Sequence, residues 1–145
     1  MIKILIADDH AVVREGLKQI LTGYPDLIVA GEACNGEEAL EKVYKGDFDF
    51  VILDITMPGK NGLDVLRELR IQRPELPVLV LSMYPEEQYA VRVLQIGASG
   101  YLTKESAPDE LIKAIRQIYK GGKYISSSLA ELLARYEIDI NNSEK

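Results

Sequence analysis

The stretch that decides the fold reads Asp49-Phe-Val-Ile-Leu-Asp54-Ile-Thr-Met-Pro58-Gly-Lys-Asn-Gly62. Its β-forming residues 50–53 predict a buried strand that delivers one carboxylate, Asp54, to the strand end. Pro58, Gly59 and Gly62 then break the chain into a loop. A carboxylate at the exposed end of a buried strand is well placed for function. On this stretch alone, Asp54 can equally cap a turn or the next helix, so both interpretations stay open.

Outward from this stretch, strand and helix patterns alternate along the chain. Aliphatic runs predict strands at residues 2–7, 27–33, 50–53, 78–81 and 100–103. Apolar residues at helical spacing predict a helix after each strand, most of them closed by glycine or proline. Five strands that alternate with five helices require parallel strands joined by right-handed crossovers, so the fold class is α/β with helices on both faces of the sheet.

Polar residues collect where these strands end. Asp8 and Asp9 follow the first strand, Asp54 ends the third, Ser82 follows the fourth and Lys104 follows the fifth. In such sheets, ligands bind outside the carboxyl ends of the strands, where the strand order switches. We therefore expect these side chains, far apart in the sequence, to meet in one crevice.

The chemistry of this set indicates a cation and a phosphoryl group. Two carboxylates about 4 Å apart repel by roughly 4 kcal/mol at an effective dielectric constant near 20. Three of them must therefore take up protons or bind a cation, and oxygen ligands suit Mg²⁺. Lys104 and the Ser82 hydroxyl can contact a phosphoryl oxygen beside the ion. Asp54 is then a candidate nucleophile that forms an acyl phosphate.

Composition limits the other possibilities. The 145 residues, 47% of them hydrophobic, predict one core. The formal net charge of −6 argues against direct nucleic-acid binding and favours a cation or a basic partner. The single cysteine, Cys34, excludes an internal disulfide and is interpreted as a small hydrophobic side chain at a strand end. Without a signal peptide or an apolar run of about 18 residues, we expect a cytoplasmic protein with no membrane partner.

From Ile2 to Gly122 the chain resembles the receiver domain of two-component response regulators. The residues that carry the resemblance are the acidic pair, Asp54 within Ile-Leu-Asp-Ile-Thr-Met-Pro-Gly, and Ser82, Tyr101 and Lys104 in the family's order. Within the family, Ala-Asp-Asp-His, Met-Pro-Gly-Lys-Asn-Gly and Gly-Tyr-Leu-Thr-Lys-Glu resemble the LuxR/NarL/FixJ subgroup. The resemblance implies a flavodoxin-like, doubly wound sheet of strand order 2-1-3-4-5 with five helices, plus a C-terminal linker helix.

The resemblance also implies roles for the acidic residues. Asp54 accepts a phosphoryl group from a sensor histidine kinase. Asp8, Asp9, Asp54 and the backbone carbonyl of Thr56 bind Mg²⁺. The chain is then a phosphoacceptor and no enzyme, with self-phosphorylation and self-dephosphorylation as its only chemistry. His10, which opens a helix beside the acidic pair, is interpreted as a capping or packing residue.

The remaining motif residues are expected to form a switch. Lys104 pairs with the phosphoryl group, Ser82 moves toward it, and Tyr101 changes rotamer. Thr56 and Tyr84 tune the lifetime of the phosphoryl group. The switched form controls homodimerisation and transcriptional output. Glu105 stands where much of the family has proline, which leaves the isomer of the preceding peptide bond open.

Residues 123–145 resemble the linker to a helix-turn-helix output domain that the 145 residues do not include. We expect residues 1–122 to form the receiver domain and DNA to be bound only through that output domain. A truncated chain is the preferred interpretation, and a natural single-domain regulator that acts by protein–protein interaction is the alternative. Leu129, Leu132, Leu133 and Tyr136 form a helical stripe that should dock on its own domain or on a second copy.

Three other functions are compatible with an α/β chain of this kind, and the site residues argue against each. A flavodoxin-like nucleotide binder needs a phosphate-receiving loop after the first strand, where Asp8 and Asp9 would repel a phosphate. A Mg²⁺-dependent aspartyl phosphatase usually carries a second acid two residues after the nucleophile, and that position here is Thr56. A binding scaffold would not require the acids, Ser82 and Lys104 at the strand ends.

Overall fold

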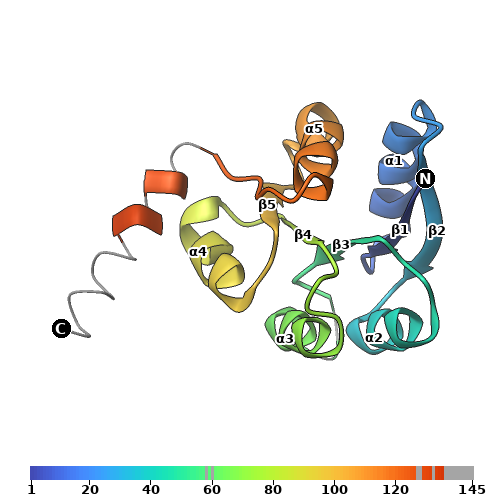
Figure 1. The fold of residues 1–145 in the computed structure, drawn as a ribbon, viewed down its shortest axis with the longest axis horizontal. Helices are drawn as coiled ribbons and strands as arrows, with labels where there is room; N and C mark the ends of the chain where they lie inside the picture. The colour runs from blue at the N-terminus through green and yellow to red at the C-terminus, as the bar shows by residue number, and fades with distance from the viewer. Residues whose placement is uncertain (58, 60, 127–128, 132, 136–145) are drawn as a thin grey trace.

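The computed structural model describes the chain except for residues 58, 60, 127–128, 132 and 136–145 and the side chains of 86–88. Its centre is a parallel sheet of five strands in the order β2-β1-β3-β4-β5, which confirms the predicted fold (Figure 1). The strands are β1 (Ile2–Ala7), β2 (Leu27–Ala33), β3 (Phe50–Asp54), β4 (Val78–Ser82) and β5 (Gly100–Thr103).

Five helices connect and follow the strands. They are α1 (Ala11–Thr22), α2 (Gly36–Lys45), α3 (Gly62–Gln72), α4 (Glu86–Ile96) and α5 (Ala107–Tyr119). Figure 1 shows α1 and α5 on one face of the sheet and α2, α3 and α4 on the other. A parallel sheet needs this double cover because its strands are apolar on both faces.

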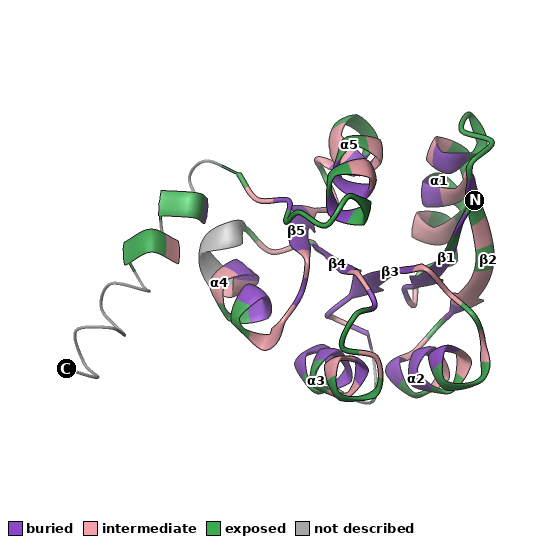
Figure 2. Ribbon diagram, in the orientation of Figure 1, coloured by how far each residue is buried: buried purple, intermediate pink, exposed green. Residues whose placement is uncertain are grey.

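Alternate residues of each central strand pack into two separate cores. On β3, Phe50 and Ile52 join the core under α1 and α5, whereas Val51 and Leu53 join the core under α2, α3 and α4. Figure 2 shows β3 and β4 as buried throughout. Burial on both faces fixes the register of β3. It also fixes the point at which Asp54 leaves the core.

The start of α3 is held directly against the backbone that follows Asp54. Asn61 caps the helix, since its side-chain oxygen accepts a hydrogen bond from Leu63 N at 2.8 Å. At Gly62, a Cβ atom would lie 2.3 Å from the carbonyl oxygen of Ile55, so only glycine fits this approach. The loop that carries the site is therefore fixed at both of its ends.

Beyond α5 the chain turns back across the edge of the sheet (Figure 1). Tyr124 forms an isolated parallel bridge with Gly100 of β5. Residues 129–131 and 133–135 are helical, and Leu129 is fully buried. The expected stripe thus docks on its own domain through Leu129 and the partly buried Leu133. Its other two members, Leu132 and Tyr136, lie outside the described residues.

Two further expectations are settled at this level. Cys34 is exposed, so its interpretation as a small hydrophobic side chain was wrong. The chain leaves the sheet after Ala33, so Cys34 no longer packs in the core. Its sulfur lies 3.4 Å from Glu38 Oε2 at the start of α2. None of the helices in the described part of the chain has the length and apolar character that a lipid bilayer requires.

Candidate functional site

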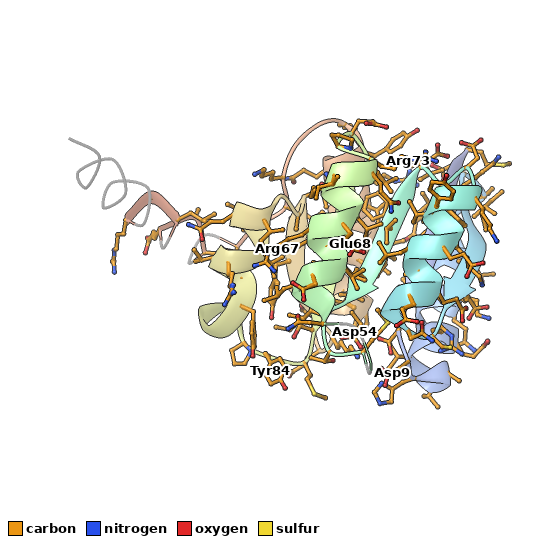
Figure 3. All side chains as sticks on the ribbon, turned by 90° about the horizontal axis from the view of Figure 1, so that it is seen from below. Asp9, Asp54, Arg67, Glu68, Arg73 and Tyr84 are labelled. Carbon is orange, nitrogen blue, oxygen red and sulfur yellow. The ribbon has the colours of Figure 1, made fainter. Side chains whose placement is uncertain are left out.

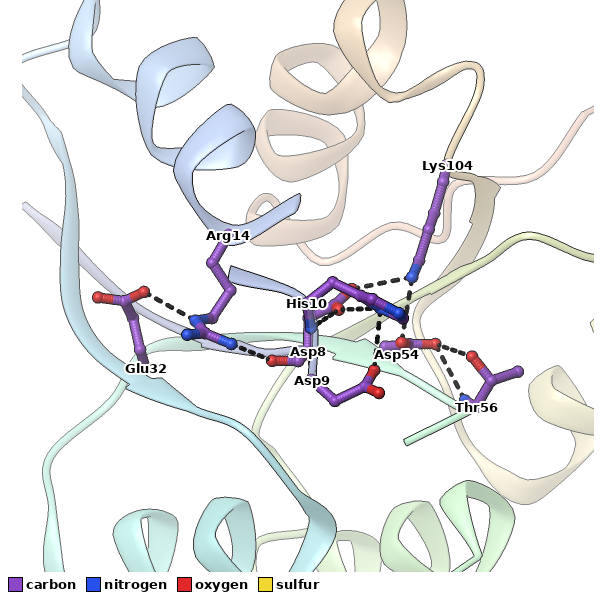
Figure 4. A network of polar contacts seen from close by, with 8 residues as sticks. All are labelled: Asp8, Asp9, His10, Arg14, Glu32, Asp54, Thr56 and Lys104. Atoms are coloured by element: carbon purple, nitrogen blue, oxygen red, sulfur yellow. Dashed lines mark hydrogen bonds and ion pairs between the residues drawn. The ribbon is translucent and has the colours of Figure 1, made fainter. Parts of the chain in front are cut away.

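The strand ends bring the predicted polar residues together at one end of the sheet. Figure 3 shows Asp9, Asp54 and Tyr84 at this end, while Arg73 lies at the opposite one. Asp54 ends β3 and is only 1% exposed. Its Oδ1 accepts hydrogen bonds from Thr56 N at 2.9 Å and Thr56 Oγ1 at 2.7 Å. Its Oδ2 lies 3.1 Å from Lys104 Nζ (Figure 4). Both oxygens of the Asp54 carboxylate therefore have hydrogen-bond partners, Thr56 on Oδ1 and Lys104 on Oδ2.

Asp8 forms an ion pair with the same Lys104 ammonium that contacts Asp54. Asp8 is 1% exposed, and its Oδ2 lies 3.0 Å from Lys104 Nζ. Its Oδ1 accepts a hydrogen bond from His10 N at 2.8 Å. Burial alone would lower the pKa of the Lys104 ammonium, but the hydrogen bonds and charges of Asp8 and Asp54 outweigh burial and raise its pKa above 10.5. Lys104 is therefore a cation at neutral pH and bridges β1, β3 and β5.

Arg14 was not identified from the sequence. Its Nη1 donates to the carbonyl oxygen of Asp8 at 2.7 Å, and its Nε donates to Glu32 Oε1 on β2 at 3.0 Å (Figure 4). The guanidinium thus holds the turn after β1 in place and thereby orients the two acids that follow. No spacing signal pointed to this role, because Arg14 and Glu32 meet only after β2 has paired with β1.

His10 also differs from its expectation. It occupies the N-cap position of α1, but its side chain makes no capping hydrogen bond and is 59% exposed. Its Nδ1 lies 3.1 Å from Asp9 Oδ1 and 3.3 Å from Asp8 Oδ1. The side chain is therefore neither a cap nor a packing residue but a neighbour of the acidic cluster.

The cluster has the donors that a divalent cation needs. Asp8, Asp9, His10 and Asp54 each offer one ligand atom, and these atoms lie within 4.8 Å of one another. The buried atoms Asp8 Oδ2 and Asp9 Oδ1 have no hydrogen-bond partner among the described residues, although each faces a nitrogen of Lys104 or His10. Several carboxylate oxygens around one point fit Mg²⁺. Thr56, the predicted carbonyl ligand, is adjacent through its two hydrogen bonds to Asp54.

A second group of residues runs from β4 to β5 behind the acids. Ser82 is fully buried, and its Oγ accepts a hydrogen bond from Tyr84 N at 3.0 Å. The hydroxyl of Tyr101, a residue that is 2% exposed, donates to the carbonyl oxygen of Tyr84 at 2.8 Å. Lys104 N donates to Ser82 O at 2.8 Å. The loop at Tyr84 therefore connects the two predicted switch residues through its backbone.

The residues predicted to tune the phosphoryl lifetime share one surface. Thr56 and Tyr84 both line a cavity of about 430 Å³ formed by the loop after β3, the start of α3 and the loop after β4. Glu105, on the other side of Lys104, is exposed. No cis peptide bond occurs in the described part of the chain, so the bond before Glu105 is trans.

The family follows from a comparison with known proteins. The model of the response regulator receiver domain matches residues 4–116. The chain belongs to this family. It is thus the receiver domain of a two-component response regulator, with a parallel sheet whose polar strand ends are those described above.

Relatives of this receiver domain are curated as regulators. It is 36% identical over 144 residues to the response regulator UvrY of Escherichia coli K12, covering 99% of this chain and 66% of that protein. It is 38% identical over 145 residues to the response regulator GacA of Pseudomonas syringae pv. syringae, covering 99% and 68%. It is 41% identical to the transcriptional regulatory protein DegU of Brevibacillus brevis, of which it covers 61%. The chain therefore spans about two thirds of the length of these relatives.

Solved structures agree with the fold of the receiver. A two-component response regulator of the LuxR family from Aurantimonas superposes with a TM-score of 0.84 at 32% identity, over 94% of this chain and 97% of that one. The isolated receiver domain of RcsB from Salmonella enterica serovar Typhimurium in the apo form gives a TM-score of 0.84 at 28% identity, over 92% and 99%. The predicted subgroup and strand order are confirmed.

Proposed function

We propose that this receiver accepts a phosphoryl group on Asp54 from a sensor histidine kinase and passes the change to an output domain. The observation that carries the proposal is the state of the Asp54 carboxylate. It is buried at a strand end, contacted by Lys104 on one oxygen and by Thr56 on the other, and surrounded by further acids. A turn cap would not require this lysine or these acids.

The transfer uses the groups already in place. A carboxylate oxygen of Asp54 attacks the phosphorus of a phosphohistidine, the new P–O bond forms as the P–N bond breaks, and the leaving imidazole takes a proton from solvent. Lys104 is placed to pair with the phosphoryl oxygens, because its ammonium lies 3.1 Å from Asp54 Oδ2. Asp8, Asp9, Asp54 and the Thr56 carbonyl would hold Mg²⁺, which neutralises the charge gathered during the transfer.

The response arises from contacts that exist only after transfer. A phosphoryl group on Asp54 offers new acceptors to the Ser82 hydroxyl and to Lys104, and these contacts favour a different arrangement of the loop at Tyr84. Tyr101 then loses or changes its acceptor, the Tyr84 carbonyl. Thr56 and Tyr84 tune how long the phosphoryl group survives, since both line the cavity beside the loop after β3.

The partners follow from the same proposal. The phosphorylated chain forms a homodimer in the cytoplasm and controls transcription through a helix-turn-helix domain, which alone touches DNA. A single-domain receiver that acts by protein–protein contact is the alternative. An aspartyl phosphatase is disfavoured because Thr56, not an acid, stands two residues after Asp54 and donates to it. The chain is in this view a phosphoacceptor and not an enzyme.

Intact-mass measurement tests the assignment of Asp54. The chain is incubated with Mg²⁺ and acetyl phosphate, and we expect the mass of one added phosphoryl group. Asp54→Asn should gain none. Asp64→Asn, which changes an exposed acid on α3, should gain the same mass as the wild type. A wild type without the added mass, or an Asp54→Asn variant that gains it, would refute the proposal.

A further inference from the structure

The segment from Lys123 to Arg135, called here the tail, is fastened to the edge of the sheet by its backbone. Tyr124 N donates to Ser99 O at 3.0 Å, and the Tyr124–Gly100 bridge extends the sheet beyond β5. On the other side of the same peptide bond, Lys123 O accepts from Gln117 Nε2 of α5 at 2.6 Å. Both polar groups of the Lys123–Tyr124 peptide are therefore bonded to the receiver.

The side chains of the tail fasten it as well. Tyr124 is 8% exposed, and its hydroxyl donates to Glu110 Oε1 on α5 at 2.7 Å. Leu129 is completely buried in the core under α2, α3 and α4, and the helical segment that carries it is capped by Ser126 Oγ, which accepts from Leu129 N at 3.0 Å. The partly buried Leu133 packs against the same core. The face formed by α4 and β5 is thus covered by this chain's own tail.

The tail shares its surroundings with a switch residue. Leu129 and Tyr101 belong to the same packed core. Tyr101 also lines a cavity of about 180 Å³ together with Glu110, Tyr124 and Ser126. Tyr101 and the tail therefore border the same cavity and belong to the same core, so a rotamer change of Tyr101 alters the surroundings of Tyr124 and Ser126.

We propose that the tail is a latch: it closes the α4–β5 face while Asp54 is unmodified and is released when Asp54 carries a phosphoryl group. The inference rests on the proposed function, because phosphorylation is the event that opens the latch. The path consists of contacts in the structure. Ser82 releases Tyr84 N as it turns to the phosphoryl group, the Tyr84 carbonyl moves, and Tyr101 follows it. The release exposes the α4–β5 face and frees the chain beyond residue 123.

Limited trypsin cleavage at Lys123–Tyr124 measures the latch directly. This bond cannot enter the protease in extended form until its hydrogen bonds to Ser99 and Gln117 break, so its cleavage rate follows the open population. Cleavage is followed by the loss of residues 124–145 in intact mass. We expect slow cleavage of the free wild-type chain and a rate that is roughly tenfold higher or more with Mg²⁺ and beryllofluoride as the phosphoryl mimic.

Three variants separate the latch from general stability. Leu129→Ala should be cut rapidly without beryllofluoride and show little further increase with it. Tyr124→Phe keeps the ring but loses the bond to Glu110, and should be cut about fivefold faster than the wild type. Glu131→Ala changes an exposed residue of the same helical segment and should behave as the wild type.

Reciprocity gives a second readout that a purely structural tail would not change. If phosphorylation opens the latch, then opening the latch must raise the affinity for the mimic by the same factor. Leu129→Ala should therefore bind beryllofluoride more tightly than the wild type in a fluorine NMR titration with Mg²⁺. Glu131→Ala should not.

The outcomes are distinguishable. If beryllofluoride binds at Asp54 but leaves both the cleavage rate and the Leu129→Ala affinity unchanged, the latch is refuted and the phosphoacceptor function stands. If the free wild type is cut as fast as Leu129→Ala, the tail is not docked and the inference fails. If neither beryllofluoride nor acetyl phosphate reacts with the wild type, the proposed function itself fails and the inference falls with it.

Discussion

Gly62→Ala is the sharpest test of how the loop after Asp54 is held. A Cβ at Gly62 would lie 2.3 Å from Ile55 O and 2.4 Å from Ile55 Cα, whereas ordinary contacts of this kind are 3.4–4 Å. The start of α3 or the backbone of Ile55 must therefore move by about 1 Å, and overpacking of this kind costs roughly 1–3 kcal/mol. Replacing glycine in a helix returns up to about 1 kcal/mol. We expect a net loss of stability of about 1–2 kcal/mol.

Gly16→Ala is the matched control, because Gly16 lies within α1 and a Cβ there would meet no atom within 4 Å. This change should stabilise the chain by about 0.5–1 kcal/mol. Urea denaturation measures both variants. Gly62→Ala should also gain the phosphoryl mass more slowly with acetyl phosphate, since Ile55 directly follows Asp54. Equal stabilisation of both variants, or a Gly62→Ala chain as stable and reactive as the wild type, would refute the close approach.

Three more predictions follow from the site and the tail. Mg²⁺ should stabilise the wild type in a saturable way, by about 2.7 kcal/mol in the free energy of unfolding at a hundred times its Kd, and the melting temperature should rise with it. Asp9→Asn should lose most of this stabilisation, and an equal rise of the melting temperature with NaCl of the same ionic strength would contradict the prediction. Lys104→Met leaves two buried carboxylates without their cation and should lower the stability in urea by about 3–5 kcal/mol at pH 7, whereas the exposed Lys113→Met should change it by less than about 0.5 kcal/mol. Burial and Glu110 raise the pKa of Tyr124 from 10.0 to about 12. The contribution of Tyr124 to stability is therefore complete below pH 10 and is lost as the pH rises to 12. In Tyr124→Phe, up to about 2 kcal/mol of this loss of stability between pH 10 and pH 12 should disappear, and a pH profile equal to that of the wild type would count against the prediction.

The residues at the ends of central strands could be predicted because burial on both faces leaves little freedom. β3 has apolar residues at every position up to Asp54, so the first polar residue also marks the end of the strand. The same logic placed Ser82 at the end of β4, and Asp8 and Lys104 directly follow β1 and β5. Their mutual distances required only the rule that parallel strands end at the same edge of a sheet.

In the edge strand β2, the periodicity of the sequence did not predict which side chains face which core. Its pairing with β1 shifts between Ile4 and Leu5, so that Val29 pairs with Ile4 but Gly31 pairs with Leu5. The irregularity moves the odd-numbered residues of β2 from the core under α1 and α5 to the opposite core. Which side chains of β2 point toward α1, including Glu32 toward Arg14, therefore depends on a bulge that leaves no pattern in the sequence.

The contacts of the tail could not be predicted from the sequence either. The sequence indicated an apolar stripe with two possible partners, its own domain or a second copy. The choice between them depends on whether Tyr124 reaches the edge of β5. It can do so because its carbonyl oxygen approaches Gly100 closely: a Cβ at Gly100 would lie 2.9 Å from Tyr124 O. Neither residue is unusual by itself.

The buried position of Leu129 also determines where this receiver can be divided. The family model ends at residue 116, but the hydrophobic core takes one of its completely buried side chains from thirteen residues further along. A chain cut after Gly122 would therefore leave the α4–β5 surface bare and prone to self-association, and its dimers would reflect the cut and not the signal. Fusions and truncations of this receiver should have their boundary beyond Arg135.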